Sequence, residues 1–228
     1  MIRNILFDLD NTLFDFDKAE ALAVRRTLLE LGVDPSPAVV TRYSQLNLAQ
    51  WKLLELGQLT RQEVKLRRYQ LLFEELGIQQ DPGKAARIYE TQLGIGHYFI
   101  EGAEELLQEL HGNYRLYLVT NGTASVQKSR LQSSGIQPYF QGIFISEELG
   151  ADKPSAAYFD ACFARIPDFQ KEETVIVGDS LTSDIKGGLN AGIRTIWFHP
   201  SSAANETGIQ PDYVLHALKD LSQLLTRL

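Results

Sequence analysis

The segment ILFDLDNTL occupies residues 5–13 and has the pattern of a buried strand that ends in two aspartates. The apolar run over 2–9 predicts a strand inside a sheet. Side chains two residues apart leave a strand on the same side, so Asp8 and Asp10 can face one cavity. Ligands bind at this end of open α/β sheets. Because two close carboxylates repel each other, the pair calls for a metal ion, a shared proton or both. Alternatively, one aspartate caps a helix.

The residues after this segment have a helical pattern that extends over 16–97. Capping signals predict four helix starts, at Asp17 with Glu20, at Ser36-Pro37, at Thr60 with Glu63, and at Asp81-Pro82. Glycines at 32, 57 and 77 are predicted to end the first three helices. The block therefore predicts an all-helical insertion directly after the aspartate pair, with linkers near 14–17 and 96–101.

From about 102 onward, strand and helix patterns alternate along the sequence. Strands are predicted at 114–119, 140–145, 174–177, 193–198 and 213–215, with helices between them. Successive βαβ units form a parallel sheet with helices on both faces. We therefore expect an α/β fold with a doubly wound parallel sheet formed by 1–15 and 98–228, and a separate helical domain formed by 16–97.

Three later loops also carry polar residues where a strand ends or a helix begins. A hydroxyl and backbone N–H groups at Thr120, Asn121 and Gly122 can hold phosphate oxygens, although a plain polar turn is the alternative. Lys153 stands directly before a proline, where a surface lysine is the alternative. Two further acids, Asp179 and Asp184, follow the strand predicted at 174–177.

These four loops carry a family resemblance. FDLDNTL at 7–13 resembles the first motif of the haloacid dehalogenase-like (HAD) superfamily, and the loops at 118–122, 153–154 and 177–184 resemble its other three motifs in order. The match covers nearly the whole chain and is most similar to the YjjG/YfnB-like branch of pyrimidine 5'-nucleotidases. The resemblance implies a Rossmann-like core with a helical C1 cap.

The resemblance implies a phosphatase mechanism for the first loop. Asp8 would attack phosphorus as the nucleophile, and Asp10 would act first as general acid and then as general base. Lys153 would neutralise the phosphoryl oxygens. The dehalogenase branch of the family lacks an acid at the position of Asp10, so this residue favours phosphoryl transfer over dehalogenation. Thr120 would be a further catalytic residue, with Asn121, Gly122 and Lys153 binding phosphate.

The resemblance also implies Mg²⁺ as cofactor. Its ligands would be Asp8, Asp179 and the backbone carbonyl of Asp10, completed by water and the substrate phosphate. Asp184 would support the site by orienting Lys153 or a metal-bound water, and a helix cap is the alternative for this residue.

The helical block would act as a lid that excludes water and recognises the leaving group. Candidate residues for substrate specificity are Phe14, Asn47, Trp51, Arg61 and Arg67, with Phe16, Tyr43, Tyr69 and Arg68 as further possibilities. Aromatic residues at helical spacing more often belong to a core, which is the alternative for each of them. The implied substrate is a pyrimidine nucleoside 5'-monophosphate of the UMP, dUMP or dTMP type.

Composition excludes several other functions. The net charge is −7 and the pI about 5.2, so a nucleic acid polymer is not an expected partner. The single Cys162 excludes an internal disulfide and is expected to be a small buried residue, with a catalytic thiol as the alternative. No run is apolar enough to span a membrane and no signal peptide pattern is present, so we expect a cytoplasmic protein. The sequence sets no expectation for the oligomeric state.

Other functions use the same four loops. A phosphatase for a sugar phosphate or phosphoglycolate is the nearest alternative, and a phosphomutase or a 2-haloacid dehalogenase is a more distant one. A non-catalytic binding module would lack at least one of Asp8, Asp10, Lys153 and Asp179, and all four are present.

Overall fold

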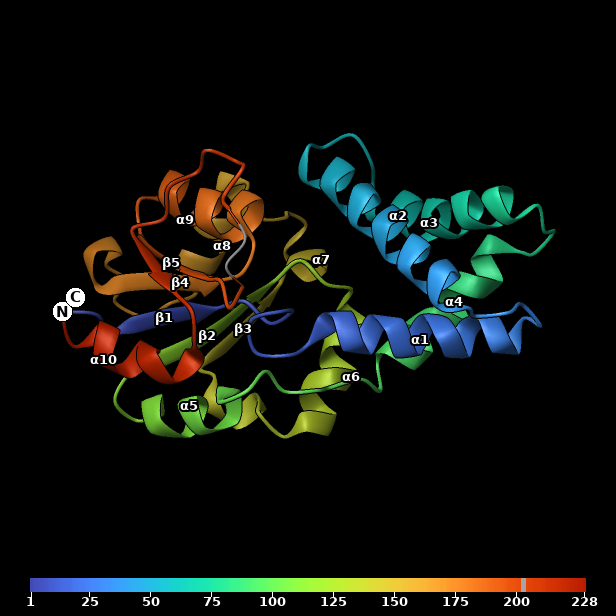
Figure 1. Cartoon of the computed structure of the whole chain (residues 1–228). Helices are drawn as coiled ribbons and strands as arrows, with labels where there is room; N and C mark the ends of the chain where they lie inside the picture. Colours follow the sequence, from blue (N-terminus) through green and yellow to red (C-terminus); the bar gives the residue numbers. More distant parts are fainter. Residues whose placement is uncertain (202–203) are drawn as a thin grey trace. The chain divides into compact units, whose positions relative to one another are not determined.

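The computed structural model describes residues 1–201 and 204–228. The chain divides into two compact units. One, the sheet unit, consists of Met1–Asp15 and Tyr98–Leu228, and the other, the helical insert, consists of Phe16–His97 (Figure 1). The predicted fold class, an α/β protein with an inserted all-helical block, is confirmed.

The sheet unit is built on six parallel strands in the order β3-β2-β1-β4-β5-β6. Their bounds are Asn4–Phe7 (β1), Arg115–Thr120 (β2), Gly142–Ile145 (β3), Thr174–Gly178 (β4), Arg194–Phe198 (β5) and Tyr213–Leu215 (β6). The chain winds outward from β1 in one direction through β2 and β3, and in the other through β4, β5 and β6. The carboxyl ends of β1, β2 and β4 therefore meet at the switch point of the sheet, where α/β proteins bind ligands.

Helices cover both faces of this sheet, as Figure 1 shows. One face packs against α5 (Ala103–Leu110), α6 (Ala124–Ser134) and α10 (Leu221–Leu225), and the other against α8 (Ala156–Phe163) and α9 (Lys186–Ala191). Alternation along β1 explains this arrangement, because Ile5 and Phe7 belong to the first core and Leu6 to the second. Shorter elements are α7 (Ser146–Leu149), η1 (Gln137–Tyr139), η2 (Lys171–Glu173), η3 (Leu181–Ile185) and η4 (Leu218–Asp220).

The helical insert leaves the sheet unit and returns to it at neighbouring points of the backbone. The Asp15 N–H donates to the Tyr98 carbonyl at 2.7 Å, and the Ile100 N–H donates to the Leu13 carbonyl at 2.9 Å. Phe14 and Phe99 lie between these bonds and pack edge to face. The two connecting segments are thus held side by side within the sheet unit.

The helical insert contains α1 (Phe16–Glu30), α2 (Pro37–Glu55), α3 (Arg61–Leu76) and α4 (Pro82–Leu93). Three predicted helix starts are confirmed, because Ser36, Thr60 and Asp81 each accept a hydrogen bond from a backbone N–H of the first turn. The start of α1 differs from the prediction. The helix begins at Phe16, and the Glu20 carboxylate is turned to other partners in the insert.

Those partners form a buried polar cluster between the helices of the insert. Arg68, which is 3% exposed, donates from Nη1 to Asn47 Oδ1 at 2.9 Å. Asn47 Nδ2 donates to Glu20 Oε1 at 2.6 Å, and Ser44 donates to the other oxygen of Glu20. The Arg68 guanidinium also lies 4.5 Å from the ring centroid of Tyr89. Burial raises the pKa of Glu20, while its hydrogen bonds to Ser44 and Asn47 oppose this shift.

Removing the buried cation should therefore weaken the helical insert. We expect Arg68→Met to lower the free energy of unfolding by about 3–5 kcal/mol, because it removes the buried positive charge that acts on the buried Glu20 carboxylate. Arg42→Met is the matched control, since Arg42 forms an exposed ion pair with Glu75 and should contribute less than about 1 kcal/mol. Urea unfolding followed by circular dichroism measures both, and equal losses would show that burial gives Arg68 no special role.

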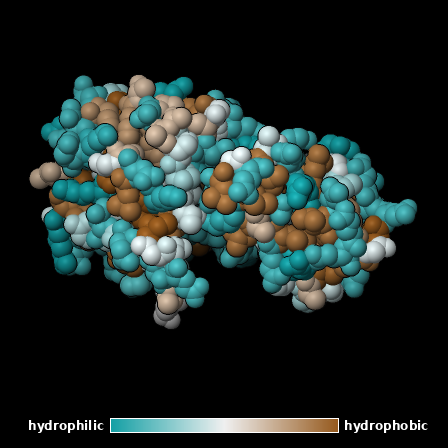
Figure 2. All heavy atoms as spheres, turned by 90° about the horizontal axis from the view of Figure 1, so that it is seen from above, coloured by the Kyte–Doolittle hydropathy of each residue, from teal (hydrophilic) through white to brown (hydrophobic). Residues whose placement is uncertain are grey.

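Figure 2 shows apolar groups interrupted by hydrophilic ones on the face it draws. Cys162 is fully buried, as predicted, and burial raises the pKa of its thiol to about 12. Within the described residues, no helix has both the length and the apolar character that a membrane crossing requires.

Candidate active site

The first loop holds both aspartates at the carboxyl end of β1. The Asp8 N–H donates to the Val177 carbonyl of β4 at 2.9 Å, which continues the ladder by one residue. The chain then turns sharply, with Asn11 in the left-handed region at φ 57° and its N–H bonded to the Phe14 carbonyl at 2.7 Å. Asparagine tolerates this conformation better than most residues. Strand β1 therefore ends at Phe7, earlier than predicted, and Asp10 lies in a tight turn.

Lys153, in the third loop, contacts each of the other three loops. Its Nζ donates to Asp8 Oδ1 at 2.6 Å, to Asp184 Oδ1 at 2.6 Å and to the Val119 carbonyl at 2.9 Å. An ammonium group has three donors, so these bonds use all of them. The side chain is 2% exposed. Burial lowers the pKa of Lys153, but the charges of Asp184 and Asp8 outweigh that effect and hold it above its usual value.

The Asn121 side chain contacts Lys153, and the phosphate contact predicted for the backbone N–H groups of this loop stays a prediction. Asn121 Nδ2 donates to the Lys153 carbonyl at 2.9 Å, and its Oδ1 accepts from the Lys153 N–H at 2.8 Å. The side chain amide thus fixes the backbone of the lysine. Thr120 Oγ1 accepts from the Gly122 N–H at 3.2 Å and is buried at the end of β2. An anion at this loop would therefore meet the Thr120 hydroxyl and backbone N–H groups, and not the Asn121 side chain.

Three carboxylates gather beside Lys153. Asp8, Asp179 and Asp184 each place one carboxylate oxygen within 4.8 Å of the others. Burial raises the pKa of Asp8 to about 7, with Lys153 opposing the shift and Asp184 and Asp10 adding to it. Burial also raises the pKa of Asp179 well above its usual value, and the charges of Asp8 and Asp184 add to that shift. One ammonium group cannot balance the negative charge of three carboxylates. The carboxylate oxygens are therefore suited to bind a hard divalent cation such as Mg²⁺.

The two carboxylate ligands predicted from the sequence, Asp8 and Asp179, both lie in this group. Asp184 is its third member, and its Oδ2 accepts from the Ser180 N–H at 3.1 Å. The prediction for Asp10 concerned its backbone carbonyl, which stays a prediction.

Local backbone features place the two acids of the fourth loop. A Cβ on Gly178 would lie 2.4 Å from the Asp184 carboxyl group, so only glycine lets this carboxylate lie against β4. The residues Leu181–Ile185 form a π-helical turn, a feature often found at functional sites, between the strand β4 and the helix α9. Trp197 Nε1 donates to the Asp179 carbonyl at 2.7 Å and fixes the backbone of that residue.

Two residues of α6, Gln127 and Arg130, belong to the site but were not predicted. Arg130 forms an ion pair with Asp10, and Gln127 donates to both Asp10 and Thr120. Both side chains are buried although both are polar. They connect the first loop to the second.

The residues predicted to recognise substrate fall into two groups. Phe14 is fully buried in the core of the sheet unit, and Asn47 is buried in the polar cluster of the insert. Trp51, Arg61 and Arg67 remain at least partly exposed on the insert. The Arg61 guanidinium lies 5.5 Å from the Trp51 ring centroid, and Arg67 Nε donates to Gln50 at 3.2 Å.

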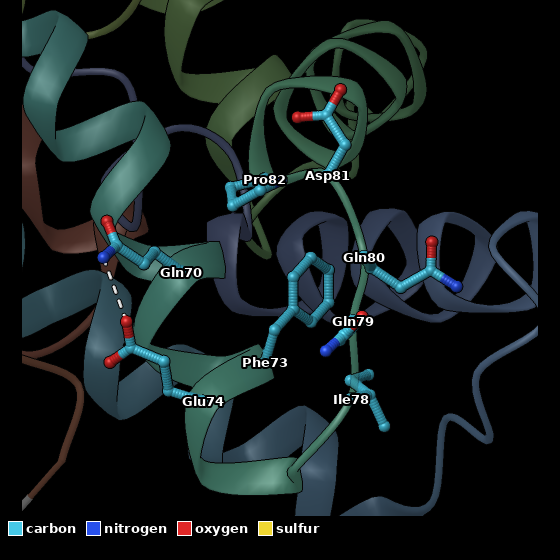
Figure 3. A pocket seen from close by; sticks show the side chains of 8 residues that line it. All are labelled: Gln70, Phe73, Glu74, Ile78, Gln79, Gln80, Asp81 and Pro82. Carbon is cyan, nitrogen blue, oxygen red and sulfur yellow. Dashed lines mark hydrogen bonds between the residues drawn. The ribbon is translucent and has the colours of Figure 1, made fainter.

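The helical insert has a hollow of its own, with a volume of about 510 Å³ (Figure 3). Gln70 donates to Glu74 at 2.9 Å on its rim. The full lining consists of Gln70, Phe73, Glu74, Ile78, Gln79, Gln80, Asp81 and Pro82. None of the predicted specificity residues lines this hollow, so we give it no part in substrate recognition.

Comparison with known proteins agrees with this geometry. The sequence pattern of the haloacid dehalogenase-like hydrolases matches residues 5–198, and the chain belongs to this family. It is 42% identical to the pyrimidine 5'-nucleotidase PynA of Streptococcus pneumoniae over 98% of this chain and 94% of that protein. It is 31% identical to the pyrimidine 5'-nucleotidase YjjG of Escherichia coli over 98% of this chain and 97% of that protein.

A solved structure is also very similar. The crystal structure of YfnB from Bacillus subtilis bound to magnesium superposes with a TM-score of 0.94. The two sequences are 40% identical, and the match covers 98% of each chain.

Proposed function

We propose that this protein is a Mg²⁺-dependent phosphatase that hydrolyses pyrimidine nucleoside 5'-monophosphates through an aspartyl-phosphate intermediate. The observation that carries the proposal is the buried group of Asp8, Lys153, Asp184 and Asp179 at the switch point of the sheet. Burying several acids around one lysine is costly unless the group has a chemical task.

The first half of the reaction forms the intermediate. Lys153 occupies Asp8 Oδ1, which leaves Oδ2 to attack phosphorus. A bond forms between that oxygen and phosphorus while the bond from phosphorus to the leaving alcohol oxygen breaks. The Asp10 carboxyl gives its proton to that oxygen. The Lys153 ammonium balances charge on the transferring group.

The second half releases phosphate. Asp10, now a carboxylate, takes a proton from a water molecule whose oxygen attacks the phosphorus of the aspartyl-phosphate. The bond between phosphorus and Asp8 breaks, so the carboxylate of Asp8 is restored. Asp8 and Asp179 would hold Mg²⁺, which when bound supplies charge stabilisation to the phosphoryl oxygens.

The nucleotide substrate is supported by the relatives. PynA and YjjG are named pyrimidine 5'-nucleotidases. Asp10 favours a phosphate ester over a haloacid, since a halide leaves without a proton. Sugar phosphates and phosphoglycolate remain the alternative substrates.

Phosphate release over a small panel tests the proposal. We expect turnover of UMP, dUMP and dTMP to exceed that of AMP, glucose 6-phosphate and phosphoglycolate, and chelation of Mg²⁺ to abolish it. Asp179→Asn should demand more Mg²⁺ for half-maximal activity, because it removes a charged ligand. Metal-dependent activity that favours the last two compounds would contradict the substrate assignment. Activity that survives chelation would contradict the metal assignment.

A further inference from the structure

We propose that Gln127 and Arg130 of α6 are positioning residues for Asp10, which hold its carboxyl group in the orientation that delivers a proton to the leaving alcohol. This inference rests on the proposed function, in which Asp10 transfers that proton. It adds two residues from a helix that the four sequence motifs do not include.

The three side chains form a closed hydrogen-bonded ring. Arg130 Nη1 donates to Asp10 Oδ1 at 2.5 Å, and Gln127 Nε2 donates to Asp10 Oδ2 at 2.7 Å. Arg130 Nη1 also donates to Gln127 Oε1 at 2.9 Å, which closes the ring. Because each oxygen of Asp10 has its own donor, the carboxylate cannot rotate about its last bond without losing at least one contact.

The two positioning side chains are themselves held in place. The Arg130 side chain is fully buried, and its guanidinium lies 5.2 Å from the ring centroid of Phe14. Gln127 is 1% exposed, and its Nε2 also donates to Thr120 Oγ1 at 3.0 Å. The residues are three positions apart on one face of α6, so a single rigid helix presents both.

Asp10 keeps the access that a proton donor needs. Its side chain is 26% exposed, in contrast to the buried side chains that hold it. A carboxylate offers about four lone-pair sites, and the ring uses two of them. The remaining sites can exchange a proton with a bound molecule while the ring stays intact.

Stability alone does not explain this arrangement. Buried ion pairs often contribute no more to stability than apolar residues of the same volume. A fixed orientation does have value in catalysis, because misplacing a catalytic group by about 1 Å can cost about 100-fold in rate. The ring is therefore better explained by the placement of Asp10 than by folding.

Gly122 gives independent support. A Cβ on this residue would lie 2.2 Å from Gln127 Nε2 and 2.5 Å from its Cδ. Any other side chain at this position would push Gln127 away from Asp10 and Thr120. The glycine of the second loop thus lets α6 reach the first loop.

The test compares two kinds of leaving group, because only a poor one needs the proton. We would measure kcat/KM, which reports transfer to Asp8, on UMP and on p-nitrophenyl phosphate, whose phenolate departs unprotonated. The variants are Gln127→Met, Arg130→Met and Arg130→Lys. Gln132→Met, on the exposed side of α6, is the matched control. Asp10→Asn is included because it shows how far kcat/KM on each substrate falls when the general acid is lost completely.

We expect Gln127→Met and Arg130→Met to lower kcat/KM on UMP by about 10- to 100-fold and on p-nitrophenyl phosphate by less than about threefold. Arg130→Lys should recover part of the loss, since it keeps the charge but lacks the planar fork of donors. Gln132→Met should match the wild type on both substrates. If Arg130→Met does not fold, Gln127→Met and Gly122→Ala give the same comparison, and Gly122→Ala should reproduce the selective loss by displacing Gln127.

Two other outcomes would overturn the inference in distinguishable ways. Equal losses on both substrates, with a selective loss in Asp10→Asn, would show that Gln127 and Arg130 only support the fold. No selective loss in Asp10→Asn would show that Asp10 is not the proton donor. That second result would remove the proposed mechanism together with the inference.

Discussion

Replacing Asp8 with asparagine is expected to lower phosphate release by more than about a thousandfold, because the amide is a poor nucleophile and no covalent intermediate can form. The fold should persist, since asparagine has nearly the same shape and its oxygen can still accept the hydrogen bond from Lys153. Asp184 remains as a charged partner of the lysine.

Steady-state phosphate release and thermal unfolding measure these two effects separately. Asp160→Asn is the matched control, because it makes the same chemical change on the exposed side of α8 and should leave activity unchanged. Retention of activity within about tenfold of the wild type would remove Asp8 as the nucleophile. Mass spectrometry after rapid acid quenching should find phosphate attached to the wild type and not to the variant.

Replacing Lys153 with methionine should affect both activity and stability. The loss of a charge at the transferring phosphoryl group is expected to lower kcat by at least about 100-fold. The variant also leaves Asp8 and Asp184 buried without their cation, which should lower the free energy of unfolding by about 3–5 kcal/mol near neutral pH.

The stability loss should depend on pH in a defined direction. Burial already raises the pKa of Asp8 to about 7, and Lys153 opposes this shift. Without the lysine, the pKa of Asp8 should therefore rise further. A carboxyl group whose pKa is higher in the folded than in the unfolded state stabilises the fold below its unfolded pKa and loses that contribution as pH rises. The variant should therefore differ least from the wild type near pH ~4 and most near pH ~8.

Urea unfolding at both pH values with a chelator present measures this difference. Lys128→Met is the control, because Lys128 pairs with Glu148 on the exposed side of α6 and should contribute less than about 1 kcal/mol at either pH. A Lys153→Met variant as stable as this control at pH ~8 would show that the buried carboxylates need no cation to fold.

Much of the fold follows from periodicity and capping chemistry. The alternation of strand and helix patterns predicted the parallel sheet, and the capping signals at Ser36, Thr60 and Asp81 placed three helix starts correctly. These features are local, so they can be recognised in a short window of sequence. The position of Asp8 and Asp10 at the end of β1 follows in the same way.

Contacts between distant segments could not be predicted by the same means. Asparagine is a residue type that is common in turns. The bonds of Asn121 to Lys153 depend on tertiary structure, because the two residues are far apart in the sequence. The π-helical turn before α9 could not be predicted either, because no residue type in it distinguishes it from an ordinary helix. Arg68 and Glu20 have the character of surface residues in sequence, and only the packing of the helices of the insert buries them together.

Gln127 and Arg130 are an intermediate case. Val126 and Leu131 mark the buried face of α6, and at about 100° per residue the two polar side chains fall on that same face. Polar residues on a buried helical face need partners, so the pattern contained a signal that a site was near. Which acid they contact depends on tertiary structure.

The paired backbone bonds at Asp15 with Tyr98 and at Leu13 with Ile100 have an evolutionary consequence. Because the insert departs and rejoins at adjacent points, its length and sequence can change without altering the register of any strand in the sheet. Under the proposed function, mutation in one part of the gene can thus change the insert while the residues proposed for phosphoryl transfer are inherited intact.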